Sequence, residues 1–295
     1  MLTDSEMPAL YRAADAASLA GQSRYVTAIR VILVGSVVAA AGGAIALTSE
    51  RWQWVAFASG VVFLVTILAS LYLAVTRPEK VWYDGRAAAE SAKSLAWEYS
   101  VGGGPFCVET CPDAEERLVT RLSDIVTKLR GFAITEQGEA TDQITDAMRS
   151  LRAEPLDGRR AAYLSHRIDD QRSWYGRKAR WNERRNQRWL LASLAAQGLG
   201  VIGAFLLGAG VIDFDALGLL AAAAAAIAAW VQAKDHAGLA QAYSIAAQEL
   251  GLAKTRLAQG ADELTWADLV DDAEQAISRE HTLWLARRGS ASQAA

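Results

Sequence analysis

The chain has 295 residues, of which 52% are hydrophobic and 21% are charged, and its formal net charge is −3. A mean hydropathy of +0.09 fits a hybrid of membrane segments and water-exposed helices, and the length permits two domains. The two cysteines, Cys107 and Cys111, are too few for a disulfide-stabilised scaffold. The net charge itself indicates little, because charged residues are segregated along the chain.

Four long segments without a formal charge occur as two close pairs. They are Val31–Ser49, Trp52–Thr76, Trp189–Ile212 and Ala216–Ala233. A helix needs roughly 20 apolar residues to cross a bilayer core about 30 Å thick, so each segment is long enough or nearly so. The sequence predicts an all-α, four-pass membrane protein built from two tandem two-transmembrane hairpins. The first span follows an acidic segment and starts too late for a secretory signal peptide, so we expect it to be retained.

Basic residues flank the span ends that lie away from the two hairpin turns. Lys and Arg near spans mark the cytoplasmic side, so we expect both termini and the middle segment in the cytosol. These flanking residues are Arg24, Arg30, Arg77, Lys80, Arg86, Lys93, Lys234 and a cluster from Arg172 to Arg188. Aromatic residues agree, with Trp52 and Trp54 at the outer boundary and Trp82, Tyr83, Trp189 and Trp230 at the inner one.

Helical periodicity also occurs outside the spans, and we expect those segments to form a cytoplasmic helical bundle. The expected helices are residues 8–30, 82–99, 112–131 and 143–152, then one from Arg159 into the third span, and finally 239–257 and 264–285. Asp157 is expected to be the N-cap of the helix that enters the third span.

The order of lead-in helix, two spans and trailing helix occurs twice, which predicts two units, residues 1–152 and 153–295. Trp82 with Arg86 and Trp230 with Lys234 share a Trp-x-x-x-basic pattern that we interpret as equivalent positions in the two units. Parallel repeats of this kind are a known membrane architecture.

A basic cluster precedes the third span. Its residues are Arg172, Arg177, Lys178, Arg180, Arg184, Arg185 and Arg188. We favour a flank that contacts anionic lipid headgroups, with part of the same helix pairing with the acidic final helix (Asp262, Glu263, Asp268, Asp271, Asp272 and Glu274). The alternative is a site for a phosphorylated ligand such as a nucleotide, because Arg forks match phosphate oxygens.

One face of the third span is polar and small. It holds Ser193, Gln197, Gly200, Ala204 and Gly208, and it predicts either a pore lining or a contact with other helices. Small residues at helical spacing on the other spans predict close helix packing. They are Gly35, Ala39 and Gly43 on the first span, Ser59, Thr66 and Ser70 on the second, and Ala222, Ala226 and Ala229 on the fourth. No Asp, Glu, Lys, Arg or His lies within a span, which argues against a transporter coupled to protons or ions.

Three acidic residues, Glu50, Asp213 and Asp215, lie in the two outer turns. In a symmetric oligomer they would form an acidic outer mouth that favours cations, and the simpler alternative is a pair of soluble turns. Cys107 and Cys111 are expected to be reduced thiols rather than a redox disulfide or half of a zinc site. No nucleotide-binding or catalytic motif occurs, so no enzyme activity, metal, cofactor or nucleic-acid partner is expected.

The chain resembles the SLATT family, two-transmembrane domains associated with SMODS and SLOG sensor proteins, in two tandem copies. In the first half the similar positions are Trp82, Arg86, Ala89, Glu90, Lys93, Trp97, Glu98 and Tyr99. In the second half they are Tyr163, Arg167, Gln171, Trp174, Tyr175, Lys178, Ala179, Asn182, Tyr243, Ala246, Ala247, Glu249, Leu250, Ala273, Glu274, Ile277, Glu280, His281 and Trp284.

The resemblance implies a homo-oligomeric effector of the bacterial inner membrane that forms or gates a pore in a conflict or antiphage response. Its cytoplasmic helices would be controlled by a cytosolic sensor or a nucleotide second messenger. A non-conducting membrane scaffold that recruits cytosolic partners is the alternative function.

Overall fold

The computed structural model describes residues 2–48, 50–129, 142–260 and 262–293, with side chains of the last helix described to residue 278. Helices fill most of these segments, and no strand occurs within the described residues. Four of the helices are long and apolar enough to cross a membrane. The predicted all-α fold with two two-transmembrane hairpins is therefore confirmed.

The four span helices are α1 (Ala9–Ala46), α2 (Gln53–Thr76), α7 (Asp170–Gly208) and α8 (Ala216–Lys234). The other helices are α3 (Pro78–Val101), α4 (Ala114–Lys128), α5 (Asp146–Ala153), α6 (Leu156–Tyr163), α9 (His236–Leu257) and α10 (Glu263–Gln293). Short 3-10 turns occupy Asp4–Glu6, Glu50–Trp52 and Gly104–Phe106, and a π-helical segment occupies Leu164–Asp169. The first span ends at Ala46 and the third at Gly208, three and four residues earlier than the uncharged runs indicated.

Contacts between residues divide the chain into two compact units. We call Met1–Gly21, Glu79–Ala179 and Gln241–Ala295 the polar unit, and Gln22–Pro78 with Arg180–Ala240 the apolar unit. Each unit therefore contains segments from both halves of the chain.

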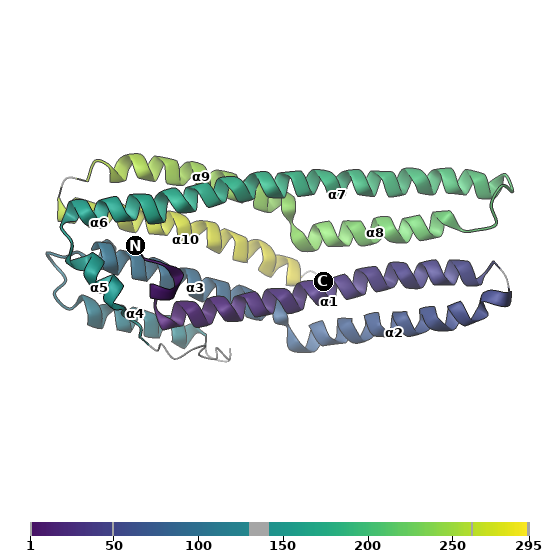
Figure 1. Ribbon diagram of the computed structural model, residues 1–295, viewed down its shortest axis with the longest axis horizontal. Helices are drawn as coiled ribbons and strands as arrows, with labels where there is room; N and C mark the ends of the chain where they lie inside the picture. Colours follow the sequence, from purple (N-terminus) through teal and green to yellow (C-terminus); the bar gives the residue numbers. More distant parts are fainter. Residues whose placement is uncertain (1, 49, 130–141, 261, 294–295) are drawn as a thin grey trace. The chain divides into compact units, whose positions relative to one another are not determined.

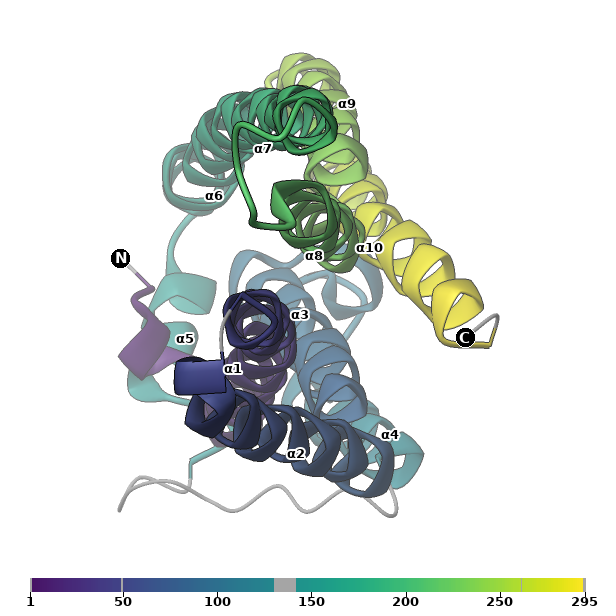
Figure 2. The same cartoon turned by 90° about the vertical axis from the view of Figure 1, so that its right-hand side faces the viewer.

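The apolar unit consists of two helical hairpins, α1 with α2 and α7 with α8 (Figures 1 and 2). Small residues bring the helices of each hairpin together. A Cβ placed on Gly35 would lie 2.6 Å from Thr66 Cγ2, one on Gly203 would lie 2.7 Å from Ala216 Cβ, and one on Gly42 would collide with Ser59 Oγ. Close approach of this kind is how helices associate in lipid, where packing drives the contact.

The small face of the first span differs from the predicted one at one position. We expected Gly43 to pack, but a Cβ at Gly43 would meet nothing within 4 Å, whereas Gly42 faces α2. Gly35 and Gly42 are seven residues apart, like their partners Thr66 and Ser59. The seam therefore follows a seven-residue repeat, as expected for helices that cross at a small angle.

Leucine at Gly42 should force α1 away from α2, because Ser59 and Val55 surround the position. We expect Gly42→Leu to lower the Tm of the full-length protein in detergent, whereas Gly43→Leu, its neighbour in open space, should leave the Tm nearly unchanged. Thermal unfolding followed by tryptophan fluorescence measures both. Equal decreases of Tm in the two variants would contradict the close packing of α1 against α2 at Gly42.

Two left-handed residues reveal how the halves of the chain correspond. Arg77 (φ 44°) ends α2 and Asp235 (φ 47°) ends α8, and each is followed at once by a trailing helix. Aligning these residues also aligns four pairs of buried positions on α3 and α9. The pairs are Gly85 with Tyr243, Ala88 with Ala246, Ala92 with Leu250, and Tyr99 with Leu257.

This alignment shows that the proposed equivalence of Trp82 and Trp230 is wrong. Trp230 precedes its left-handed residue and lies in α8, whereas Trp82 follows its own and lies in α3. Trp82 is also buried rather than placed as an interfacial anchor, and Ser18 Oγ donates to its carbonyl at 3.0 Å. A four-residue pattern is too short to reveal the backbone break that sets the register.

A buried ion pair lies at the centre of the polar unit. Arg167 donates from Nε and Nη2 to the two carboxylate oxygens of Glu274 at 2.9 and 2.7 Å, and their side chains are 2% and 0% exposed. Tyr163 Oη and Ser94 Oγ donate to the same carboxylate at 2.9 and 2.7 Å. Four hydrogen bonds thus satisfy a charge that would otherwise be costly to bury.

Aromatic rings and the end of α3 surround this pair. Tyr163 makes edge contacts with Trp97 and Trp266, with centroid distances of 5.9 and 5.8 Å. Trp266 Nε1 and Arg159 Nη1 both donate to the carbonyl of Val101, at 2.8 and 2.7 Å. These bonds satisfy a carbonyl at the end of α3 that has no partner within its own helix. They fix α3 against α6 and α10.

The helical segment that leads into the third span begins at a different residue from the one we expected. Pro155, not Asp157, occupies the N-cap position of α6, and Asp157 lies in the first turn, where it accepts from Arg160 at 3.2 Å. Proline favours this boundary because it lacks an N–H and fixes φ. Helical structure then continues to Gly208, and it changes from α-helix to π-helix over the short segment that contains Arg167.

Removal of one partner from the buried pair should be strongly destabilising. We expect Glu274→Ala to cost about 3–5 kcal/mol, because it leaves the Arg167 charge buried without its carboxylate. Asp146→Ala is the control: Asp146 pairs with Arg149 at 3.4 Å, and the two side chains are fully exposed and about half exposed, respectively. A surface pair is worth about 0–1 kcal/mol. Chemical unfolding of the full chain in detergent measures the free energy of unfolding of both variants. Similar losses of stability would contradict the central role of the buried pair.

Glu98, beside this pair, carries a carboxyl group with a perturbed pKa. Burial, together with the charges of Glu274 and Asp271, raises the pKa of Glu98 to about 8, although Arg121 and Arg167 act in the opposite direction. A raised folded-state pKa means that the folded protein binds a proton more tightly than the unfolded chain does. The associated stability is complete below about pH 4.5, the ordinary value, and is lost as the pH rises through about 8.

Glutamine at this position mimics the protonated carboxyl at every pH. We therefore expect Glu98→Gln to raise the Tm above that of the unmodified protein at pH 8.5, and the difference to shrink as the pH falls toward 4.5. The exposed Glu116→Gln on α4 serves as the control and should show the same small change at both pH values. A Tm difference for Glu98→Gln that does not depend on pH would contradict the proposed ionisation.

Candidate functional site

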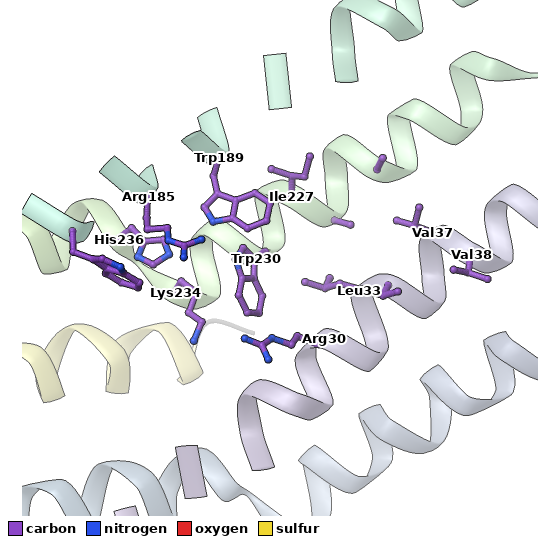
Figure 3. A pocket seen from close by; sticks show the side chains of 14 residues that line it. Arg30, Leu33, Val37, Val38, Arg185, Trp189, Ile227, Trp230, Lys234 and His236 are labelled. Atoms are coloured by element: carbon purple, nitrogen blue, oxygen red, sulfur yellow. The ribbon is translucent and has the colours of Figure 1, made fainter. Parts of the chain in front are cut away.

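The apolar unit contains an open groove with a cavity volume of about 630 Å³ (Figure 3). Three stripes of residues and the first residue of α9 line it. They are Arg30, Leu33, Val34, Val37 and Val38 from α1; Trp181, Arg185 and Trp189 from α7; Ala223, Ala226, Ile227, Trp230 and Lys234 from α8; and His236. The volume lies within the range of about 300–1,000 Å³ that is usual for ligand sites.

Helical periodicity explains why these residues share one space. The α1 residues follow the spacing i, i+3, i+4, i+7, i+8, the α8 residues follow a related spacing, and the α7 residues recur every four positions. Each set therefore forms a stripe along one face of its helix. The stripe of α1 meets those of the distant α7–α8 hairpin around the groove.

The groove is cationic at one end and apolar at the other. Arg30 and Lys234 both approach the ring of Trp230, with their charged groups 5.5 and 5.1 Å from its centroid. Arg185 lies over Trp181 at 5.2 Å. Valine, leucine, isoleucine and alanine side chains line the remainder, as the labelled side chains of Figure 3 illustrate. Each cation–π contact contributes about 0.5–1 kcal/mol at an exposed site and holds the cations at the rim.

Further contacts hold the aromatic rings at the cationic end. Trp189 and Trp230 make an edge contact with centroids 6.3 Å apart, and Trp181 contacts His236 at 5.5 Å. A hydrogen bond of 2.8 Å joins His236 Nδ1 to Asn182 Oδ1, and both side chains are buried. This bond ties the start of α9 to α7 where the groove begins.

The structure divides the face predicted to line a pore. Gln197 is exposed and donates to Ser193 at 3.1 Å, one turn earlier on the same helix. Gly200 is buried beside α8, where a Cβ would lie 3.5 Å from atoms of Leu217 and Leu220. Ala204 is half-buried, and Gly208 ends α7 in open space. Of the predicted set, Ser193 and Gln197 are the two residues that form a polar pair.

The acidic residues of the outer turns have different surroundings. Asp215 is the N-cap of α8, and its Oδ1 accepts from the backbone of Gly218 at 2.9 Å. Glu50 and Asp213 are exposed. A structural role in the turn is therefore visible for Asp215.

The predicted basic cluster is exposed in all its members, which are Arg172, Arg177, Lys178, Arg180, Arg184, Arg185 and Arg188. Pairing of this helical run with the acidic final helix is confirmed, but through two earlier residues. Arg159 pairs with Glu263, and Arg167 pairs with Glu274. Arg185 alone of the exposed cluster lines the groove.

Sequence reasoning identified fewer than half of the groove residues, each separately, and did not bring them together. Arg30 and Lys234 were read as span flanks, Trp189 and Trp230 as anchors, and Ala226 as part of a packing face. The helical spacing of each stripe was a signal available in the sequence, whereas the juxtaposition of the stripes was not. The two cysteines lie elsewhere, in the polar unit, as buried free thiols.

Comparison with known families assigns both halves of the chain. The model of SMODS and SLOG-associating 2TM effector domain 3 matches residues 8–160, and that of SMODS and SLOG-associating 2TM effector domain 1 matches residues 163–284. The chain belongs to the SLATT family. It is thus a multi-pass membrane protein that carries two tandem SLATT effector domains. No curated protein and no solved structure matches it.

The family resemblance seen in the sequence includes residues of the buried core. Tyr163, Arg167 and Glu274, three positions that carry the resemblance, meet in the central hydrogen-bonded group. Tyr175 and Tyr243, two more, stack with centroids 5.6 Å apart. Most of these SLATT-like positions therefore maintain the polar unit and do not line the groove.

Proposed function

We propose that this SLATT protein is a non-enzymatic effector of a bacterial conflict or antiphage response. Several copies assemble in the inner membrane and open a pore. Both termini and the polar unit lie in the cytosol, where a sensor protein or a nucleotide second messenger controls the pore. The basic flanks of the spans and the acidic outer turns support this orientation.

The observation that carries the proposal is the exposed polar pair on the third span. The Gln197 amide has two N–H donors and a carbonyl acceptor, and the bond to Ser193 uses one donor. In hydrocarbon each remaining unsatisfied group would cost several kcal/mol. The amide therefore requires either water or a polar group of another helix. A water-filled lumen lined by several copies supplies both.

The unburied surfaces of the spans support assembly. In the most apolar stretches of the four span helices, 6%, 6%, 11% and 0% of the residues are buried within one chain. Most of this surface is therefore available for contact with lipid or with further copies. Exposed small residues on these helices permit close contact with a second copy.

Removal of the amide should close or distort the pore. We expect Gln197→Leu to abolish ion flux through liposomes that contain the activated full-length protein, and Gln197→Asn to retain it. The control is Leu194→Val, on the same helix, whose leucine is 56% exposed. Fluorescent measurement of ion flux and of membrane depolarisation in cells provides the readout.

The scaffold alternative makes the opposite prediction. If Gln197→Leu protected cells as well as the unmodified chain and the liposomes stayed ion-tight with both proteins, the pore proposal would be wrong. Recruitment of cytosolic partners would then be the function to pursue.

A further inference from the structure

We propose that the groove in the apolar unit is a specific binding site for an anionic phospholipid. An acyl chain lies along the apolar walls, and the phosphate lies between Arg30, Arg185 and Lys234. This inference does not depend on pore formation, because lipid binding is measured without ion flux.

The distribution of charge along the groove matches an amphipathic anion. Its three cations come from three helices and gather at one end, each beside a tryptophan ring. Among the described residues, no carboxylate forms an ion pair with Arg30 or Arg185. Guanidinium groups donate to two phosphate oxygens at once, which suits them to a headgroup.

The dimensions and direction of the walls match an acyl chain. Residues 30 and 38 of α1 are separated by about 12 Å along the helix, and residues 223 and 234 of α8 by about 16 Å, at a rise of about 1.5 Å per residue. Arg30 begins its stripe, Lys234 ends the other, and both approach Trp230, so the polar ends of the two walls coincide. Beyond this end the walls are apolar for two to three helical turns.

The location of the walls favours a lipid over a soluble phosphate. The apolar residues belong to α1 and α8 segments that are long and apolar enough to cross a membrane. Tryptophan is enriched where a span meets the headgroup region, and Trp181, Trp189 and Trp230 all lie at the cationic end. A free nucleotide would contact the cationic end and leave the apolar walls uncovered, whereas a phospholipid would cover both the cationic end and the apolar walls.

Adjacent arginines on α7 allow a matched test of the cationic end. Arg185 lines the groove and Arg184, the residue before it, does not, although both are exposed. Native mass spectrometry of the full-length protein in detergent should measure binding of dioleoyl-phosphatidylglycerol. We expect Arg30→Gln with Arg185→Gln to weaken it about fivefold per charge removed. The control, Arg184→Gln with Arg188→Gln, should change it less than twofold. Arg30→Lys with Arg185→Lys should retain most of the affinity, which would show that the fold is intact.

A second pair of variants tests the apolar wall. Ala226 lines the groove, whereas the neighbouring Ala225 is exposed outside it. Ala226→Trp fills the cavity and should abolish the tightest phosphatidylglycerol adduct, whereas Ala225→Trp should preserve it. Phosphatidylcholine should bind at least tenfold more weakly than phosphatidylglycerol, because its headgroup has no net negative charge.

Four results would overturn the proposal. Equal losses in the two arginine pairs would indicate general attraction of anionic lipid to the basic flank. Equal losses in the two tryptophan variants would place the lipid elsewhere. Displacement of the lipid by millimolar inorganic phosphate or by a cyclic dinucleotide would assign the cations to a soluble ligand. A lower oligomer mass for Ala226→Trp with unchanged lipid binding would assign the groove to a second copy of the chain.

Discussion

The polar unit depends on the buried ion pair between Arg167 and Glu274. Neither charge could remain in the core alone, because desolvation of a single ion costs several kcal/mol even after relaxation. Ser94 and Tyr163 complete the hydrogen bonds of the carboxylate. The group joins α3 of the first SLATT domain to the helical run before the third span and to α10 of the second. The two domains thus share one core, and the charges at its centre specify which helices meet.

A different constraint governs the apolar unit, whose solvent is lipid. Lipid tails are as apolar as the side chains, so hydrophobic burial gives the spans no reason to associate, and close packing at Gly35, Gly42 and Gly203 takes its place. A groove remains between α1, α7 and α8. Its cations lie at the same end as its tryptophans, which is the arrangement that a headgroup region stabilises.

Local features were predictable, and features that depend on register were not. The length of the segments without formal charge identified the four spans, and the helical spacing of apolar residues identified the helices outside them. The acidic final helix was correctly expected to pair with the basic run, but sequence favoured no arginine of that run over another. In the structure Arg159 and Arg167 are buried and pair with the acidic helix, whereas the basic residues between Arg172 and Arg188 are exposed. Gly42 was missed beside Gly43, and Trp82 was misassigned, because one residue of rotation or one left-handed residue changes which face is inward.

The sequence by itself determined the number of spans, the helical class and the membership of the SLATT family, because hydropathy, helical period and residue pattern are local properties of the chain. Only the tertiary structure decided which small residues are in contact and which arginines are buried. It also decided that the stripes of α1, α7 and α8 line a single groove. Those outcomes depend on the relative rotation of helices that are far apart in sequence. That rotation is set by the sum of many weak packing contacts, which no single segment encodes.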